Sequence, residues 1–169
     1  FLPRDVRFSV DGTRAVVVGR GSLTSIDLRD LDGKVAQPVA QADFDNTASE
    51  IVVDSTAQLV ALRYPGVARV DVVDLVTGVT SCFATPGLVA DIALTPDDSL
   101  LVSFSEENAN GFSRLQMIDA ATDECATVVS DLMLEKAARI TMNYSGTRAV
   151  AYDPDPEFES IWNIELDTM

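Results

Sequence analysis

Short apolar stretches separated by polar turns recur along the whole chain. A stretch that alternates apolar and polar residues comes first, then a turn rich in Asp, Ser, Gly and Thr, then a strongly apolar stretch. Runs of four to six residues bounded by such turns are typical of β-strands. The predicted strand pairs are Val6–Val10 with Ala15–Val18, Ile51–Val53 with Leu59–Leu62, Ile92–Leu94 with Leu100–Phe104, and Ile140–Met142 with Ala149–Tyr152. The near-continuous apolar character of each second strand predicts burial on both faces.

Two further strands follow in each unit. The third strand ends at an acidic residue, and a second turn leads to the fourth. The predicted third strands are Leu23–Asp27, Ala68–Asp74, Leu115–Asp119 and Ile161–Glu165, and the predicted fourth strands are Val35–Ala40, Val79–Ala84 and Cys125–Val129. The segment from Ser130 to Ile140 departs from this pattern, because its apolar residues have helical spacing. We expect a connecting loop with one helical turn there.

The units form an internal repeat. The five residues Gly-Thr-Arg-Ala-Val occur identically at Gly12–Val16 and at Gly146–Val150. The first turn falls at Gly12, Thr56, Asp98 and Gly146, and the acidic residue falls at Asp27, Asp74, Asp119 and Glu165. Both series keep a period of about 45 residues, which is the length of a four-stranded propeller blade.

The repeat predicts an all-β fold, a β-propeller or a partial propeller arc. It has about four blades of four antiparallel strands, and the last blade is incomplete. We expect one domain over residues 1–169, with blades at approximately 5–41, 50–86, 91–130 and 139–169.

Two arrangements of these blades remain open. The chain closes as a small four-bladed ring, or it is part of a larger propeller whose other blades lie elsewhere. The incomplete fourth unit favours the second arrangement, and the start at Phe1 favours a processed or excised piece. An open arc would expose apolar residues of its end blades. The candidates are Phe8, Val16 and Val18 at one end and Trp162 and Ile164 at the other.

The repeated motifs resemble the bacterial β-propeller repeats of the YVTN type, relatives of WD-repeat and lactonase-like propellers. The opening motif appears as "FSVDGTRAVVV", "LTPDDSLLVSF" and "NYSGTRAVAY", and the third-strand motif appears as "TSIDLRDLDG", "VDVVDLVTG" and "LQMIDAATD". The resemblance covers nearly the whole chain. The YVTN tetrapeptide itself is absent, and no unit carries the Trp-Asp pair of WD repeats. The resemblance implies the fold and says little about function.

The charge of the chain narrows the choice of partners. The net charge is −15, with Lys34 and Lys136 as the two lysines. A surface this acidic repels phosphate backbones and anionic lipid, so we expect no nucleic-acid partner. No apolar run approaches the roughly 20 residues of a membrane helix, so we expect no membrane insertion.

The lack of histidine and the presence of two cysteines limit the catalytic and metal-binding chemistry of the chain. The absence of His excludes a Ser-His-Asp triad and His-based zinc sites. Cys82 and Cys125 lie in the predicted fourth strands of neighbouring blades. They form one disulfide or remain two thiols, and the spacing alone does not decide between these states.

Polar loops on one predicted face carry the candidate binding residues, since loops that connect strands often carry function. These are Arg20, Tyr64, Glu106, Glu107, Asn108, Asn110, Asp153, Asp155, Glu157 and Glu159. Oxygen ligands of this kind suit Ca²⁺. A calcium site at Asp153, Asp155 and Glu157 is therefore the alternative to a solvated acidic rim, and no other cofactor is predicted.

Two further repeat positions favour a structural role. The acidic residues at the ends of the third strands are expected to accept hydrogen bonds from backbone N–H groups two residues on. Arg14 and Arg148 share one repeat position beside the turn, which favours the same interpretation.

Three functional hypotheses follow. The first is a non-enzymatic binding scaffold, periplasmic or extracellular, for a protein or glycan partner, with further propeller blades in cis or in trans as additional partners. The second is a lactonase-like or glycan-active enzyme whose site is completed by other blades. The third is a packing module in a larger assembly. The lack of a catalytic constellation favours the first and leans against an enzyme.

Overall fold

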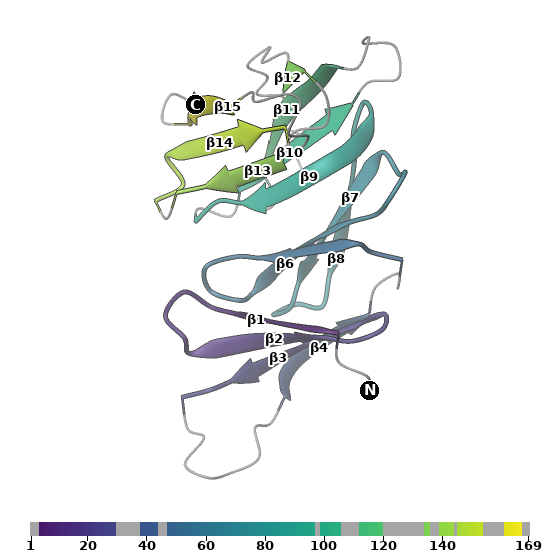
Figure 1. Cartoon of the computed structure of the whole chain (residues 1–169). Helices are drawn as coiled ribbons and strands as arrows, with labels where there is room; N and C mark the ends of the chain where they lie inside the picture. Colours follow the sequence, from purple (N-terminus) through teal and green to yellow (C-terminus); the bar gives the residue numbers. More distant parts are fainter. Residues whose placement is uncertain are drawn as a thin grey trace.

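The described residues form β-strands joined by turns and loops. The computed structural model describes residues 4–29, 38–43, 47–96, 99–105, 112–119, 134–135, 139–143, 145–153 and 161–166. Within these ranges the chain forms fifteen strands in four antiparallel sheets and no helix (Figure 1). Each sheet is built from consecutive strands, in the order in which they follow one another along the chain.

The four sheets correspond to the four sequence repeats. Sheet 1 contains β1 (Asp5–Phe8), β2 (Arg14–Val18), β3 (Ser22–Asp27) and β4 (Pro38–Asp43). Sheet 2 contains β5 (Glu50–Val53), β6 (Leu59–Arg63), β7 (Arg69–Asp74) and β8 (Thr80–Ala84). Sheet 3 contains β9 (Leu88–Leu94), β10 (Ser99–Ser105), β11 (Phe112–Asp119) and β12 (Leu134–Glu135). Sheet 4 contains β13 (Arg139–Met142), β14 (Arg148–Tyr152) and β15 (Ile161–Glu165).

The first three strands of every sheet confirm the sequence prediction to within a few residues at each end, and so does β8. The fourth strand of sheet 1 is shifted, because β4 starts at Pro38 and continues through Asp43. The prediction ended this strand at Ala40. The register explains the shift, since Ser22 at the start of β3 pairs with Asp43.

The prediction of a loop with a helical turn is wrong at Leu134 and Glu135. These residues form β12, in which Leu134 pairs with Ser113 and Glu135 pairs with Phe112 of β11. Pairing with the free edge of β11 outweighs the weak helical spacing of the local sequence. The predicted fourth strand at Cys125–Val129 lies outside the described residues.

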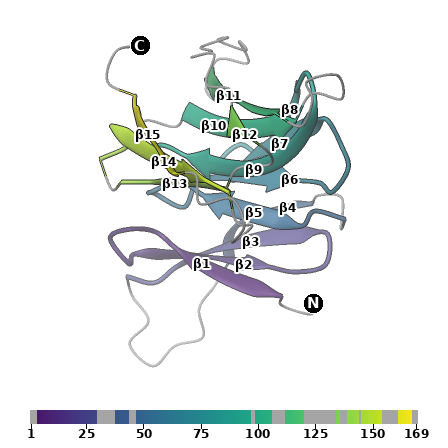
Figure 2. The same ribbon diagram turned by 45° about the horizontal axis from the view of Figure 1, so that its top comes forward.

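The sheets stack face to face in chain order (Figures 1 and 2). An apolar cluster fills each of the three junctions. Val16, Val18 and Leu23 meet Val60 and Leu62 between sheets 1 and 2. The other two junctions contain Ala61, Val72, Phe83, Ile92 and Leu100 between sheets 2 and 3, and Leu101, Leu115, Ile140, Ala151 and Ile164 between sheets 3 and 4. Since Val60 and Ala61 of β6 face opposite neighbours, the predicted two-sided burial of this second strand is confirmed.

The stack is an open arc, because the outer faces of sheets 1 and 4 are solvent-exposed. Phe8 is 62% exposed, as expected, and Ile161 of sheet 4 is 71% exposed. The prediction is wrong for Val16 and Val18, which are buried against sheet 2. It is also wrong for Trp162 and Ile164, which pack toward sheet 3. The period-2 alternation places these four residues on the inner face of their strand rather than the outer one.

The turn between the first and second strands is built alike in all four sheets. Its first residue has a polar side chain, and that side chain accepts a hydrogen bond from the backbone N–H at the start of the second strand. The bonds are Arg14 N to Ser9 Oγ at 2.9 Å, Leu59 N to Asp54 Oδ1 at 2.8 Å, Ser99 N to Thr95 Oγ1 at 2.9 Å, and Arg148 N to Asn143 Oδ1 at 2.9 Å. In every sheet, the side chain that directly follows the first strand therefore closes the first turn.

The same turns correct one landmark of the repeat. Gly12 and Gly146 have positive φ angles of 69°, and the residue with a positive φ in the second turn is Ala57, at 56°. The sequence alignment had placed Thr56 there. An alanine in this left-handed conformation carries a strain that a glycine avoids.

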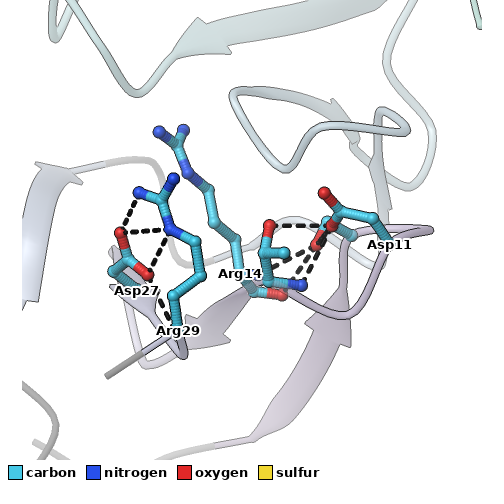
Figure 3. Close-up of polar contacts among 6 residues, drawn as sticks. Asp11, Arg14, Asp27 and Arg29 are labelled. Carbon is cyan, nitrogen blue, oxygen red and sulfur yellow. Dashed lines mark hydrogen bonds and ion pairs between the residues drawn. The ribbon is translucent and has the colours of Figure 1, made fainter. Parts of the chain in front are cut away.

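The acidic residues that end the third strands support the backbone, as predicted, in two of the sheets, and Figure 3 shows one of them, Asp27 beside Arg29. Asp27 Oδ1 accepts from Arg29 N at 3.0 Å, and Asp74 Oδ1 accepts from Val76 N at 2.7 Å. The hydrogen bonds from Arg29 hold the pKa of Asp27 well below its usual range. Glu165 instead pairs with Arg148, whose Nη2 lies 3.2 Å from Glu165 Oε1. The Asp119 side chain lies outside the described part.

Candidate functional site

A charged residue occupies one repeat position at the inner end of every sheet. The first strands β1, β5, β9 and β13 lie along the axis of the arc, where they line common cavities. The residue just before the short apolar stretch of each of these strands is charged. We call this set the axial ring: Asp5, Glu50, Asp91 and Arg139.

Arginines connect the members of the axial ring across sheets. Glu50 is opposite Arg63 in the β5–β6 pair, and Arg63 Nε donates to Glu50 Oε2 at 2.7 Å. Arg139 Nη1 lies 3.9 Å from Glu50 Oε1 and 3.4 Å from Asp91 Oδ1. The network therefore joins sheets 2, 3 and 4 at the axis.

A β-bulge lies next to Asp91, whose side chain faces sheet 4. Ser103 pairs with Asp91 and Phe104 pairs with Val89, so Ala90 is the extra residue. A bulge of this kind re-aims the side chains that follow it. The Asp91 side chain is buried, and its Oδ2 accepts a hydrogen bond from the backbone N–H of Ile140 at 2.7 Å. One carboxylate thus links sheet 3 to the first strand of sheet 4.

Glu50 has an unusual protonation equilibrium. Burial raises the pKa of Glu50 to about 7, and the nearby carboxylate of Asp91 acts in the same direction. The Arg63 guanidinium opposes this shift but does not cancel it. Glu50 therefore exchanges a proton in the neutral pH range, where an ordinary glutamate is fully ionised.

The axial ring borders a cavity that is rich in arginine. We call it the axial pocket; its volume is about 370 Å³. Its charged lining residues are Arg4, Asp5, Arg7, Glu50, Arg63 and Arg139. Four guanidinium groups against the carboxylates of Asp5, Glu50 and the adjacent Asp91 make this a cationic spot in a chain whose net charge is −15, although Arg7 pairs with Asp5 and Arg63 with Glu50. Such a site favours an anionic group of a ligand.

A neighbouring cavity along the axis is more apolar than the axial pocket. A second cavity of about 510 Å³ runs along the same first strands toward the turns. Its lining residues include Phe8, Val52, Ile92, Ile140 and Met142. The axial pocket is therefore at the end of the axis that carries the loops between sheets and the loops between second and third strands.

The structure describes three of the predicted binding residues. Arg20 is exposed in the turn between β2 and β3. Asp153 follows β14 and is half-buried. Tyr64 is only 2% exposed, so it packs inside the arc rather than projecting from a loop. The remaining residues, Glu106, Glu107, Asn108, Asn110, Asp155, Glu157 and Glu159, lie outside the described part.

Tyr64 belongs to a buried polar cluster around Asp71. Its hydroxyl donates to Asp71 Oδ2 at 2.9 Å, and the Arg69 guanidinium lies 4.9 Å from the Tyr64 ring centroid. Arg69 Nε lies 2.9 Å from Asp71 Oδ1, and the Cys82 thiol donates to the same oxygen at 2.9 Å. These contacts hold the outer strands of sheet 2 together.

Cys82 is exposed, and its surroundings favour the protonated thiol. Desolvation and the adjacent Asp71 carboxylate raise the pKa of Cys82, which disfavours the nucleophilic thiolate. Cys125 lies outside the described residues, so a disulfide between the two cysteines stays a prediction.

The described residues offer no group of three acidic or thiol side chains placed to hold a metal ion. Two of the three residues proposed for calcium, Asp155 and Glu157, lie outside this part, so the calcium site stays a prediction. In the described ranges no helix has the length and apolarity needed to cross a membrane.

Sequence reasoning missed the axial ring, although the sequence contained a signal for it. Glu50 and Arg139 stand directly before the apolar stretches "IVV" and "ITM", and Asp91 is the one charged residue in "LVADIAL". The predicted first strands began one residue later, at Ile51, Ile92 and Ile140, so these charged residues fell outside them. Aligned on the turn, they occupy one position, which the order of strands brings together at the axis.

Comparison with known proteins supports the fold. No family model matches the chain, and no curated protein matches it. Hydrazine synthase from Kuenenia stuttgartiensis has a TM-score of 0.68 at 15% identity, over 97% of this chain and 46% of that chain. A protein of unknown function from Desulfotomaculum acetoxidans has a TM-score of 0.64 at 18% identity, over 96% of this chain and 51% of that chain. The chain thus spans about half the length of these two proteins.

A named propeller is also similar to the chain. The β-propeller domain of Cps50 (Swd1) from Myceliophteria thermophila has a TM-score of 0.52 at 13% identity, over 99% of this chain and 67% of that chain. At such low identity the similarity concerns the fold alone. Together with the four stacked antiparallel sheets, it defines the class: the chain is an all-β, partial β-propeller arc, and its sheets are the blades.

Proposed function

We propose that this propeller domain is a non-enzymatic binding scaffold whose partner presents an acidic group to the axial pocket. The partner is a protein or a glycan that contacts the loop face around the pocket. The observation that carries the proposal is the presence of Arg4, Arg7, Arg63 and Arg139 around one cavity. The repeat motifs support a place for the domain among YVTN-type propellers.

The geometry suits a single acidic group. Guanidinium groups bind carboxylates through paired, charge-assisted hydrogen bonds. A cavity of about 370 Å³ is at the small end of the range for ligand sites. The pocket therefore fits one sugar acid residue or one acidic side chain, while the surrounding loops contact the rest of the partner.

Two matched probe pairs test this proposal. The glycan pair is a galacturonic acid trisaccharide and its uncharged galactose counterpart. The peptide pair is a short Glu-rich peptide and its Gln counterpart. Isothermal titration calorimetry should show binding of at least one acidic probe and no binding of its neutral counterpart. The pair that binds identifies the partner as a glycan or as a protein.

Variants then assign the binding to the pocket. The double variant Arg4→Gln/Arg7→Gln should lose roughly tenfold or more in affinity, because each charge-assisted hydrogen bond contributes about 1.5–3 kcal/mol. Arg148→Gln is the matched control, since Arg148 is an exposed arginine at the opposite end of its blade. Equal losses in both variants, or no binding of either acidic probe, would contradict the proposal.

A second candidate function is lactonase-like or glycan-active hydrolysis with a site completed by other blades. One observation favours it: Glu50, with a pKa of about 7, lies beside Asp91 at the edge of the axial pocket. A carboxyl group with a pKa near neutrality is suited to general acid–base catalysis.

Hydrolysis of gluconolactone or of a chromogenic glycoside would test this alternative. The expected rate depends on pH near 7 and is abolished by Glu50→Gln, while Glu165→Gln, at an exposed position, leaves it unchanged. No turnover of either substrate, or full activity of Glu50→Gln, would leave the binding scaffold as the remaining function.

A further inference from the structure

The outer face of sheet 1 has apolar residues at positions suited to an interface, and two of them, Val6 and Phe8, are 42% and 62% exposed. Val16 and Val18 face sheet 2, so the residues between them in β2 face outward. Register places Val6 opposite Val17, Phe8 opposite Ala15, and Ala15 opposite Ile26. We call this set the entry face: Val6, Phe8, Ala15, Val17 and Ile26. These five residues are apolar, and Thr24, which pairs with Val17, lies on the same face.

The same five positions in sheet 2 form a real junction. In the repeat alignment, the positions of the entry face correspond to Ile51, Val53, Val60, Leu62 and Val73. All five belong to the apolar cluster by which sheet 2 packs on sheet 1. The entry face therefore repeats, residue for residue, the surface that a blade uses to dock on the blade before it.

The opposite end of the arc carries the complementary surface. Sheet 1 contacts sheet 2 through Val16, Val18 and Leu23. Their counterparts in sheet 4, which pair as Tyr152 with Ile161 in the same way as Val18 with Leu23, are Val150, Tyr152 and Ile161. We call these three residues the exit face. They point away from sheet 3, and Tyr152 and Ile161 are 40% and 71% exposed. The polar residues Thr141 and Asn163 pair with Val150 and lie on the same face.

We propose that the entry face receives the exit face of a second copy of this chain. A joint between Phe8 or Val6 and Ile161 or Tyr152 reproduces the chemistry of the junction between sheets 1 and 2. Two copies related by a two-fold axis form two such joints at once, as closed symmetric dimers require. Eight blades would then close the ring, which is within the range of four to eight found in propellers.

The ring explains the exposed apolar residues on the two end faces of the arc. A terminal sheet that stays in water is expected to have a polar outer face, as the end repeats of stacked proteins do. Here both terminal faces keep apolar residues at the positions that are buried inside the arc. Continuity with the internal junctions thus identifies another propeller blade as the occupant.

Sedimentation velocity of the 169-residue chain tests the proposal. Measured in about 0.5 M NaCl, which screens the repulsion between two copies of net charge −15, the protein should sediment as a dimer of the 18.1 kDa chain. Phe8→Glu and Ile161→Glu should each weaken the dimer at least roughly a hundredfold, because each places a charge inside an apolar joint. The exposed positions leave the fold of the monomer intact, which far-ultraviolet circular dichroism would verify.

The control is Val76→Glu. Val76 is 66% exposed, which is similar to Phe8 at 62% and Ile161 at 71%. It lies in the turn after β7, away from both faces. It should leave the dimer unchanged. A monomer at all concentrations would overturn the proposal, and so would a dimer that resists either test variant. A dimer broken by Phe8→Glu but not by Ile161→Glu would also overturn it, because sheet 1 would then pair with itself.

Discussion

Gly12 and Gly146 share one backbone conformation but have different neighbours. Gly12 and Gly146 have the same φ of 69° in equivalent turns. A Cβ at Gly12 would meet no atom within 4 Å, whereas a Cβ at Gly146 would lie 2.3 Å from Pro96 Cδ in the turn of the preceding sheet. The identical pentapeptides therefore face different local surroundings.

The two alanine variants should separate strain from packing. Gly12→Ala should cost about 1 kcal/mol in the free energy of unfolding, from the positive φ alone. Gly146→Ala should cost about 1–3 kcal/mol more, because the new methyl group must displace Pro96. Urea denaturation of both variants measures the difference. Equal costs would contradict the close contact between the turns of sheets 3 and 4.

Glu50 is the residue whose ionisation affects the stability of the arc. Its pKa rises from 4.5 to about 7 on folding, so the folded state binds the proton more tightly than the unfolded state. The stability from this proton is complete below pH 4.5 and is lost as the pH rises through about 7.

The wild type should therefore lose more stability between about pH 5 and about pH 8 than Glu50→Gln does. Chemical denaturation at both pH values measures this difference. Glu165→Gln, which removes an exposed carboxylate, should follow the wild type. If the two variants behave alike, the pKa of Glu50 is ordinary.

At the scale of the strand and turn, the Asp54 side chain organises the first turn of sheet 2. Its buried carboxylate accepts hydrogen bonds from the backbone N–H groups of Thr56 at 3.1 Å, Gln58 at 2.7 Å and Leu59 at 2.8 Å. The turn that includes the strained Ala57 is therefore held by one side chain.

Asp54→Ala should destabilise the domain by about 2–3 kcal/mol, because it removes the acceptor of three backbone N–H groups. The control is Asp54→Asn, since Asn143 closes the equivalent turn of sheet 4 with its amide oxygen. Asn should cost less than about 1 kcal/mol. Thermal unfolding compares the two, and a similar loss in both would show that charge rather than hydrogen-bond acceptance is what the turn requires.

The strands were largely predictable, and the exceptions have physical causes. Short alternating stretches such as "EIVV" and apolar runs such as "RAVVV" are bounded by turn residues, so local chemistry defines them. The extent of β4 and the existence of β12 depend instead on which edge of β3 or β11 is free to pair. The axial ring depends on long-range assembly as well, because Glu50 and Asp91 meet only after their sheets stack.

At the scale of the whole molecule, stability is distributed unevenly along the arc. Sheets 2 and 3 are packed on both faces, while sheets 1 and 4 are packed on one. In a stack of this kind each unit is stabilised mainly by its nearest neighbours. The inner sheets should therefore open less often than the outer ones.

Amide hydrogen exchange of the Phe8→Glu variant, in which the two end faces are expected to stay uncovered, tests this distribution. Equivalent second strands give the cleanest comparison: β6 and β10 should exchange more slowly than β2 and β14. Uniform protection in all four strands would indicate that the arc opens only as a single cooperative unit.

The repetition of one junction chemistry also bears on how such a chain can change in length. Val60 and Leu62 meet sheet 1 at the positions that Ala15 and Val17 present outward at the end of the arc. A gene duplication or deletion of one whole unit of about 45 residues would leave every remaining blade beside a surface that it already fits. The number of blades can therefore vary in evolution without the redesign of a shared core, while the axial ring gains or loses one charge at each step.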